Sequence, residues 1–568
     1  MIDWTQIERG PWGEHIRRRL GQLEQERVVA RIWEHDHRVW KPEPAEISNR
    51  LGWLHTADVM ETAVAEWPAW VDQLHREGYR YALLLGMGGS SLAPEVFSKT
   101  FEHRRLQLDV LDSTDPAVVL GRAEALDLAR TLFIVSTKSG GTVETFSFFR
   151  FFYNRVVETL GAERAGEHFV AITDPGSGLA ETAERYAFRR TFLNDPNIGG
   201  RYSALSCFGL VPAAVLGVDL RLLLARARQM MLACGAEMPA SQNPAAQLGV
   251  TMGELARAGR DKLTFVISRP IASFGDWVEQ LIAESTGKEG TGILPVVGEP
   301  LAEPQLYGND RVFVRLSLGD DLDDRADEVR LQALEEAGHP VVRVRLADSY
   351  DLGGQFFLWE LATAIAGHIL GINPFDQPNV EAAKVLARQM VTEYKARGSL
   401  PDEPPVFADQ GVAVYANLPA GRKLVSLADA WAYFLGLARP GDYLALQAYL
   451  PPTPALGRAL AELRLRLRQR CRLATTVGYG PRFLHSTGQL HKGDAGRGLF
   501  VQITADAPRD AAIPDEAGKP ESSITFGVLE MAQALGDRHA LLNAGRRVLR
   551  FHLKDVLADL HTLCEALA

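Results

Sequence analysis

Short apolar runs alternate regularly with amphipathic helical patterns along most of this sequence. From Arg80 onward the apolar runs are separated by longer amphipathic segments such as Val143–Thr159. This alternation is typical of a parallel sheet with helices packed on both faces. The expected strands of the first block are Tyr81–Leu85, Leu106–Leu111, Leu132–Val135, Phe169–Ile172 and Arg190–Leu193. We therefore predict an α/β fold.

The same alternation of expected strands and helices occurs in two further blocks along the chain. After a helical connector (Tyr202–Ala258), a second block has expected strands and helices at Leu263–Ile267, Phe274–Ser285, Val312–Leu316, Ala326–Ala337, Val341–Arg345, Gln355–Leu370 and Val380–Ala396. A Pro-rich stretch, Leu400–Val406, marks the next boundary, and further strands are expected at Val412–Tyr415, Tyr443–Tyr449, Leu499–Thr504 and Val548–Phe551. We predict two doubly wound sheets with flanking helices plus a C-terminal α/β block. The expected division is a helical extension (1–60), a first α/β domain with its connector (61–258), a second (259–400) and a C-terminal region (401–568).

Composition excludes several classes of protein. Of the 568 residues 46% are hydrophobic and 23% charged, as in soluble globular domains. The net charge of −10 argues against bulk attraction to nucleic acid or anionic lipid. The four cysteines lie far apart and indicate neither a metal site nor a disulfide framework. The N-terminus lacks the apolar core of a secretory signal, and the apolar stretch Leu210–Val218 is too short to span a bilayer. We expect a soluble, cytoplasmic protein.

Three glycine-rich turns follow expected strands. The first, Gly86–Ser91, can present backbone N–H groups to an anion at a helix start, or can be a tight turn without a ligand. The second, Ser136–Thr145, carries several hydroxyls and a lysine, which favours a phosphate monoester over a simple helix cap, because a cap needs one hydroxyl. The third, Asn197–Ser203, has an arginine after two glycines, which can let the backbone and the guanidinium approach a ligand; taken alone it favours a surface turn with a solvated arginine.

Two later segments carry candidate catalytic groups. Gln280 and Glu284 are four residues apart and share one face of the expected helix Phe274–Ser285, with Glu284 near its end. Lys384 is expected about one turn into the helix that begins near Val380. An isolated glutamate at a helix end is usually only solvated, so these residues carry little weight by themselves.

Together these segments resemble phosphoglucose isomerases, enzymes built on two sugar isomerase (SIS) domains. The matching segments, in order, are Gly86–Ser90, Thr137–Glu144, Gly199–Ser203, Gln280–Lys288 and Asn373–Lys384. The resemblance spans roughly residues 30–400. The remainder, including Gly480–Gln489, looks like the isomerase half of bifunctional transaldolase/phosphoglucose isomerase fusions, without room here for the transaldolase barrel.

The resemblance implies an isomerase of glycolysis and gluconeogenesis that interconverts glucose 6-phosphate and fructose 6-phosphate through a cis-enediolate, without metal or organic cofactor. It implies Glu284 as the base, with Gln280 beside it, Arg201 as the group that stabilises the enediolate oxygen, and Lys384 as a group that helps to open the ring. It implies substrate or phosphate contacts from Gly89, Ser90, Thr137, Lys138, Ser139, Thr142, Gly200 and Gln377. It also implies a homodimer.

The sequence departs from the family at the ring-opening histidine. Phosphoglucose isomerases carry it in a loop after the Glu284 motif, but the corresponding stretch here, Gly298–Asp310, has none. Lys384 acting alone, a histidine from the C-terminal region (His485 or His491) and spontaneous ring opening are the three alternatives. We favour a histidine from the C-terminal region, and for His485 a buried or capping role is an equal alternative to the catalytic one. The arginine-rich helix Leu456–Arg472 in the same region is expected to present a solvated basic face.

Two other functions fit the same motifs. A non-catalytic SIS-domain sensor of sugar phosphates would keep the phosphate loops and could lose the base. A dual isomerase would also act on mannose 6-phosphate. The retained Glu284, Arg201 and Lys384 count against the sensor.

Overall fold

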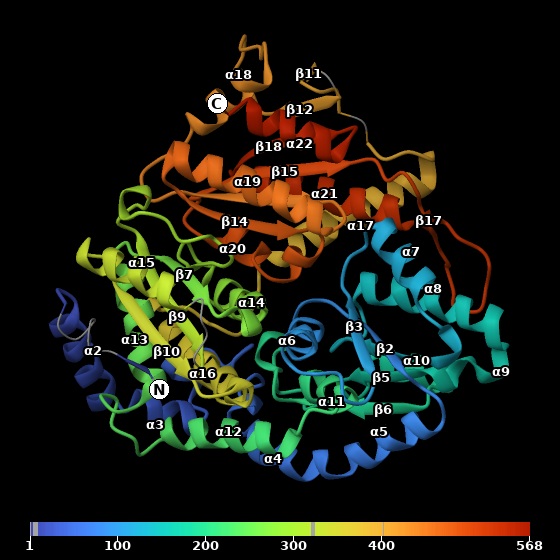
Figure 1. Ribbon diagram of the computed structural model, residues 1–568, viewed down its shortest axis with the longest axis horizontal. Helices are drawn as coiled ribbons and strands as arrows, with labels where there is room; N and C mark the ends of the chain where they lie inside the picture. Colours follow the sequence, from blue (N-terminus) through green and yellow to red (C-terminus); the bar gives the residue numbers. More distant parts are fainter. Residues whose placement is uncertain (1, 4–9, 320–323, 402, 410, 568) are drawn as a thin grey trace.

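The computed structural model describes residues 2–3, 10–319, 324–401, 403–409 and 411–567. Three sheets of five or six strands, each covered by helices, form three units that meet near the middle of the molecule (Figure 1). The α/β fold predicted from the sequence is confirmed. Residues 4–9, part of the N-terminal stretch used above to argue against a secretory signal, lie outside the described residues. Among those described, no helix combines the length and apolar character that crossing a bilayer requires.

The first sheet is fully parallel and has the order β3-β2-β4-β5-β6. Its strands are β2 (Tyr81–Leu85), β3 (Gln107–Leu111), β4 (Thr131–Ser136), β5 (Phe169–Thr173) and β6 (Arg190–Leu193). All six residues of β4 are buried, because helices cover both faces of the sheet. The covering helices include α6 (Leu92–Thr100), α7 (Pro116–Ala125), α8 (Val143–Leu160), α10 (Gly178–Arg185) and α11 (Cys207–Leu216).

The second sheet has the order β1-β10-β9-β7-β8, with only β1 antiparallel. Its strands are β7 (Lys262–Ile267), β8 (Leu294–Val296), β9 (Arg311–Leu318), β10 (Val341–Leu346) and β1 (Ile2–Asp3). Its helices include α12 (Leu220–Ala233), α13 (Pro244–Arg257), α14 (Phe274–Thr286), α15 (Asp324–Glu336) and α16 (Leu352–Leu370). Helix α16 is buried almost all round, as its apolar sequence requires.

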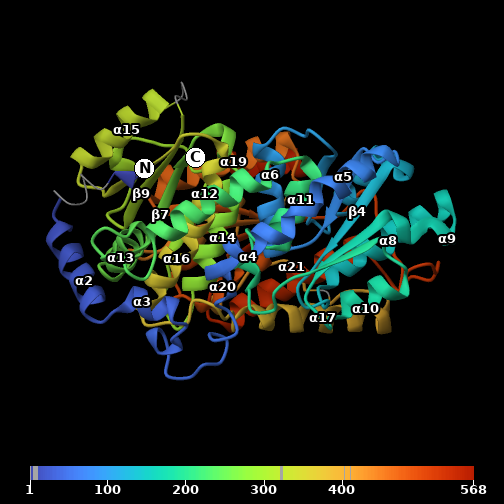
Figure 2. The same cartoon turned by 90° about the horizontal axis from the view of Figure 1, so that it is seen from below.

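The N-terminal helices lie against both of these units and do not form a core of their own (Figure 2). They are α2 (Gly13–Gln25), α3 (Val28–Trp33), α4 (Thr56–Ala63) and α5 (Trp67–Arg76). Trp53 is buried in the shared core, and the indole of Trp40 donates to the carbonyl of Ala364 in α16 at 2.7 Å. These tryptophans dock the segment onto the α/β units.

The C-terminal sheet has the order β11-β12-β18-β15-β13-β14. Its parallel centre consists of β13 (Tyr443–Tyr449), β14 (Ala474–Tyr479), β15 (Gly498–Ala505) and β18 (Arg547–Leu553), and β11 (Phe407–Asp409) and β12 (Val412–Ala416) close one edge antiparallel. Helices α18 (Leu427–Leu435), α19 (Pro454–Cys471), α20 (Gly488–Gly493), α21 (Phe526–Asn543) and α22 (Val556–Glu565) surround it.

Helix α17 (Val380–Arg397) ties the C-terminal unit to the rest of the chain by packing along α21. The two helices approach so closely that a Cβ on Gly536 would lie 2.8 Å from the backbone nitrogen of Ala387. The α17–α21 pair therefore brings the C-terminal region against the segments that follow the first two sheets.

Candidate functional site

Helix α14 supplies the two candidate residues predicted to share a face. The Nε2 amide of Gln280 donates to Oε2 of Glu284 at 3.1 Å, and Oε1 of Glu284 lies 3.5 Å from Nη1 of Arg201. Glu284 keeps 12% of its side chain exposed, whereas Arg201 is almost fully buried. A carboxylate held beside a fixed cation, with access from outside, can accept and return a proton.

The Arg201 guanidinium is held from several directions by segments far apart in the sequence. Its Nε donates to Oγ of Ser285 at 2.8 Å and its Nη1 to Oε1 of Gln377 at 3.0 Å. Its Nη2 donates to the carbonyl oxygens of Pro374 and Asp376, at 2.7 and 2.9 Å. The alternative of a solvated arginine on a surface turn is therefore wrong. These bonds fix the positive charge next to Glu284.

The glycines of the first and third turns allow the two loops to touch. A Cβ on Gly89 would lie 2.1 Å from the carbonyl oxygen of Gly200, a distance that no real contact permits. Gly88 has a positive φ of 54°, and a Cβ there would meet His485 and the Gln280 amide at 2.9–3.0 Å. Close backbone packing thus requires these glycines, and it brings buried Ser90 beside the Arg201 turn.

The second turn leaves its hydroxyls uncommitted to helix capping. Thr142 is the N-cap residue of α8, yet its side chain makes no capping bond and instead lies 2.9 Å from the Thr137 hydroxyl. The Ser139 hydroxyl accepts from the backbone N–H of Gly141 at 3.3 Å. The Lys138 ammonium pairs with Asp174 and donates to the carbonyl of Pro196 at 2.9 Å. Lys138 is therefore already partnered, whereas the hydroxyls surround an open helix start.

His485 reaches this group of residues from the C-terminal unit. It lies in the segment Arg482–Ser486, which we call the His485 segment, and its carbonyl accepts from the Gln280 amide at 2.8 Å. Its Nε2 lies 2.9 Å from Oε1 of Glu144, in the first turn of α8. Burial would raise the pKa of Glu144, but the charge and hydrogen bond of His485 outweigh it and leave that pKa below its ordinary value.

Lys384 and His491 have different placements. Lys384 is exposed on α17, and its charge also lowers the pKa of Glu144, so it faces the same region. His491 is enclosed by the C-terminal sheet, with its ring 4.9 Å from that of Phe500 and its Nδ1 3.4 Å from the Gln447 amide. Burial lowers the pKa of His491 well below its ordinary value. Of the two C-terminal histidines, the structure brings only His485 to the site, which corrects the expectation for His491.

The loop Gly298–Asp310 is bound by the arginine-rich helix α19. The buried Glu299 carboxylate lies 3.0 Å from Nη1 of Arg311 and accepts from the Thr475 hydroxyl at 2.7 Å. Arg464 and Arg468 of α19 are buried beside it, and Arg464 donates to the Val297 carbonyl at 2.9 Å. The prediction of a solvated basic face was wrong for these two arginines. Sequence periodicity could not reveal this, because their acidic partner comes from another unit.

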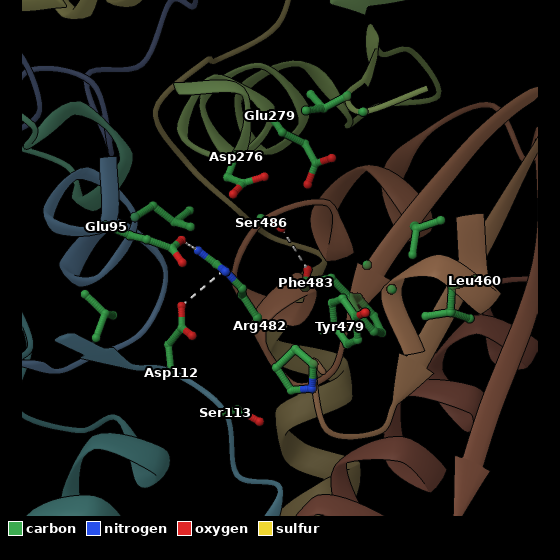
Figure 3. Close-up of a pocket in the computed structure, with 18 of the residues that line it drawn as sticks. Glu95, Asp112, Ser113, Asp276, Glu279, Leu460, Tyr479, Arg482, Phe483 and Ser486 are labelled. Atoms are coloured by element: carbon green, nitrogen blue, oxygen red, sulfur yellow. Dashed lines mark hydrogen bonds and ion pairs between the residues drawn. The ribbon is translucent and has the colours of Figure 1, made fainter. Parts of the chain in front are cut away.

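A cavity of about 570 Å³ lies where all three units meet, behind the His485 segment (Figure 3). Arg482 extends into it between Glu95 and Asp112, pairing with both; its Nε lies 3.1 Å from Asp112. Asp276 and Glu279 point into the cavity from α14, and burial together with the charge of Asp276 raises the pKa of Glu279 to about 8. Arg482 thus attaches the His485 segment to the first unit.

Sequence reasoning missed four residues that complete the arrangement: Glu144, Ser285, Asp376 and Gln533. Glu144 belonged to a matched motif but was given no role, and Ser285 directly follows Glu284. The carboxylate of Asp376 lies 2.8 Å from Nζ of the buried Lys288, whose pKa burial lowers to about 8. Gln533 gave no signal, because nothing local marks a glutamine in α21.

Comparison with known proteins finds similarity to phosphoglucose isomerases. A model of the phosphoglucose isomerase family matches residues 69–292. The chain is 30% identical over 361 residues to glucose-6-phosphate isomerase of Rubrobacter xylanophilus, an alignment that covers 55% of this chain and 83% of the relative. It is 28% identical over 384 residues to the enzyme of that name from Parabacteroides distasonis, covering 59% and 85%.

A crystal structure of a hypothetical protein from Thermus thermophilus aligns with a TM-score of 0.60 and 26% identity, covering 68% of this chain and 99% of that protein. The Rubrobacter relative is matched over most of its length, and the segments that match include the turns and the helix that position Arg201 and Glu284. The chain belongs to the phosphoglucose isomerase family.

Proposed function

We propose that the protein interconverts glucose 6-phosphate and fructose 6-phosphate by moving a proton between C2 and C1. The observation that carries the proposal is Glu284, held between the Gln280 amide and the fixed Arg201 guanidinium. Aldose–ketose isomerisation needs a base that shuttles one proton and a positive group at the oxygen where charge develops. This pair supplies both, and the proposed route needs neither metal nor organic cofactor.

The hydroxyls of Ser90, Thr137, Ser139 and Thr142, with Gly89 and Gly200 beside them, are proposed to hold the sugar phosphate. The open N-terminus of α8 favours an anion through its unpaired N–H groups and its dipole. Lys138 contributes charge while paired with Asp174. Gln377, which accepts a hydrogen bond from Arg201, is proposed to contact the sugar too.

Ring opening is proposed to involve His485 and Lys384. With Nε2 of His485 bonded to Glu144, Nδ1 is the nitrogen that remains to exchange a proton with the substrate. His485 takes the proton of the C1 hydroxyl, and the Lys384 ammonium gives one to the ring oxygen. Glu144 holds the imidazole in one tautomer, as the carboxylate partners of catalytic histidines do in other enzymes.

The direct test is Glu284→Gln, which keeps the size of the side chain and removes the base. We expect turnover of fructose 6-phosphate to fall by ~10²–10⁴-fold. Glu279→Gln is the matched control on the same helix, because Glu279 faces the separate cavity and already favours its neutral form near neutral pH. Wild-type turnover in Glu284→Gln would exclude Glu284 as the base.

A parallel assay separates the other candidate functions. A wild-type protein that binds both sugar phosphates without turnover would be a sensor, and turnover of mannose 6-phosphate would make it a dual isomerase. We also propose that the enzyme acts in the cytoplasm as a homodimer that binds neither nucleic acid nor membranes. Sedimentation velocity measures the oligomeric state, and a monomer at working concentration would contradict this part of the proposal.

A further inference from the structure

A glutamine of the C-terminal unit bonds the same carboxylate oxygen as His485. The Nε2 amide of Gln533 donates to Oε1 of Glu144 at 2.6 Å. On the other side, Oε1 of Gln533 accepts from the Thr114 hydroxyl at 3.0 Å. Thr114, Glu144 and Gln533 are each at most 5% exposed. Water therefore does not replace these bonds readily.

The chain of bonds has one consistent direction. An ionised carboxylate only accepts hydrogen bonds, so the Gln533 amide must turn its nitrogen to Glu144 and its oxygen to Thr114. The Thr114 hydroxyl fits this orientation because it donates to that oxygen. Thr114 of the first unit thus fixes the orientation of the Gln533 amide, and that amide holds the Glu144 carboxylate in place.

We infer that Gln533 is a positioning residue for the His485–Glu144 pair. Its amide stabilises the Glu144 carboxylate when His485 is neutral, the state in which Nδ1 can take a proton from a sugar hydroxyl. Without this donor, His485 would be the main compensation for the buried charge and would hold its proton to a higher pH. Gln533 itself touches neither the substrate nor a reacting atom.

The surrounding charges do not duplicate this role. Lys384 faces Glu144 from α17 but is exposed, so solvent screens its effect. Glu530, one turn earlier on α21, lies near Asp115 and Asp510, and burial raises its pKa well above the ordinary value. When Glu530 is neutral it carries no charge that could affect the protonation of His485. In the part of the chain that the structure describes, the other hydrogen bonds to the Glu144 carboxylate come from His485 and from the backbone N–H of Glu144 itself.

The test compares Gln533→Met with Gln502→Met. Gln502 is an equally buried glutamine of the C-terminal unit, and its amide donates to the Ala534 carbonyl at 3.0 Å without reaching Glu144. Because a hydrogen bond to a charged group is lost, we expect kcat/KM on cyclic glucose 6-phosphate to fall roughly 10–100-fold in Gln533→Met. The acid limb of its pH profile should move to higher pH, and activity on an open-chain substrate should be retained.

This inference rests on the proposed function, so its second measurement needs no turnover. Histidine-labelled, ligand-free protein is titrated by NMR, and the His485 signal is assigned from its loss in His485→Gln. The His485 midpoint should rise in Gln533→Met and stay at its wild-type value in Gln502→Met. An inactive wild-type protein would contradict the proposed function, whereas an unmoved midpoint in Gln533→Met would overturn the role of Gln533.

Thr114→Val provides an independent variant should Gln533→Met fail to fold. It removes the hydroxyl that orients the glutamine and leaves Gln533 and Glu144 in place. The same upward shift of the His485 midpoint, smaller in size, is expected. No shift in a folded Thr114→Val protein would contradict the proposed chain of bonds.

Discussion

The loop Gly298–Asp310 and the His485 segment show how the C-terminal unit acts in two ways on one enzyme. The loop follows the helix that carries Glu284, has no histidine, and is bound through Glu299 to buried arginines. The His485 segment comes from the C-terminal unit and places an imidazole 2.9 Å from Glu144 of the first unit. The C-terminal unit thus holds the loop in a buried ionic network and, on the other segment, carries the histidine that we propose for ring opening.

Different interactions stabilise the two segments. Glu299 is fully buried among cations, so its contribution is to folding. The His485 segment is held by a few polar contacts, from Arg482, Gln280 and Glu144, around an imidazole that the proposed mechanism brings to the substrate. Changes in the loop should therefore alter stability, and changes in the segment should alter catalysis.

The largest effect is expected from His485→Gln. Loss of a general acid–base group should lower kcat/KM on cyclic glucose 6-phosphate by ~10²–10⁴-fold, while an open-chain substrate keeps most of its rate. Steady-state assays with both substrates give the ratio. His491→Gln is the matched control and should leave that ratio unchanged, because His491 lies within the C-terminal sheet. An equal loss on both substrates in His485→Gln would contradict a ring-opening role.

Glu299→Gln should show the opposite pattern. Removing the carboxylate leaves buried arginine charge without its partner, which should lower the free energy of unfolding by about 3–5 kcal/mol. Denaturant unfolding measures this value, and kcat/KM of the folded protein should be unchanged. Glu303→Gln, at an exposed position of the same loop, is the control. If Glu299→Gln lost activity while keeping its stability, the loop would have a catalytic role.

Arg482→Met should have an intermediate effect. It removes the ion pairs that attach the His485 segment to Glu95 and Asp112, and charged hydrogen bonds of this kind contribute about 1.5–3 kcal/mol. A roughly 10–100-fold loss of kcat/KM, again confined to the cyclic substrate, is expected. The exposed Arg458→Met serves as the control. Full activity in Arg482→Met would show that the segment is positioned without this contact.

The smallest effect is expected from moving a histidine into the other segment. Gln305 is exposed in the loop Gly298–Asp310, and Gln305→His in the His485→Gln background should restore no activity. The described hydrogen bonds and ion pairs of this loop to other elements are with α19, β9, β14 and β7, and not with α8, so we do not expect a histidine there to meet Glu144. The assay is the same pair of substrates. Recovery of the cyclic activity would show that the loop can still enter the site.

Much of the fold was predictable because buried parallel strands read as continuous apolar runs. Tyr81–Leu85 and Tyr443–Tyr449 coincide with the buried strands β2 and β13. The strands that were missed lack that signal. Strand β14 reads Ala-Thr-Thr-Val-Gly-Tyr, β8 has three residues around Pro295, and β1 is two residues paired with a strand more than 300 positions away.

In the candidate site, too, residues in local motifs were predictable and contacts between distant segments were not. The turns, Gln280 and Glu284 follow local motifs, and the sequence predicted them as a group. The partners of Arg201 in Pro374–Gln377, the bond from His485 to Glu144 and the role of Gln533 depend on contacts between distant segments. No spacing rule encodes such contacts. The sequence therefore left His485 and His491 as two candidates for ring opening and gave no reason to choose between them.

The strand order of the C-terminal sheet has a consequence for how a nascent chain becomes an enzyme. Strand β18 is the last strand in the sequence, yet it lies between β12 and β15 in the sheet. During synthesis the earlier strands of this sheet leave the ribosome with their central partner missing, so the sheet cannot close until nearly the whole chain has emerged. Stop codons shortly before Arg547 would therefore release chains that contain every proposed catalytic residue but lack β18. In such chains β12 and β15 would have unpaired edges, and unpaired edges favour aggregation.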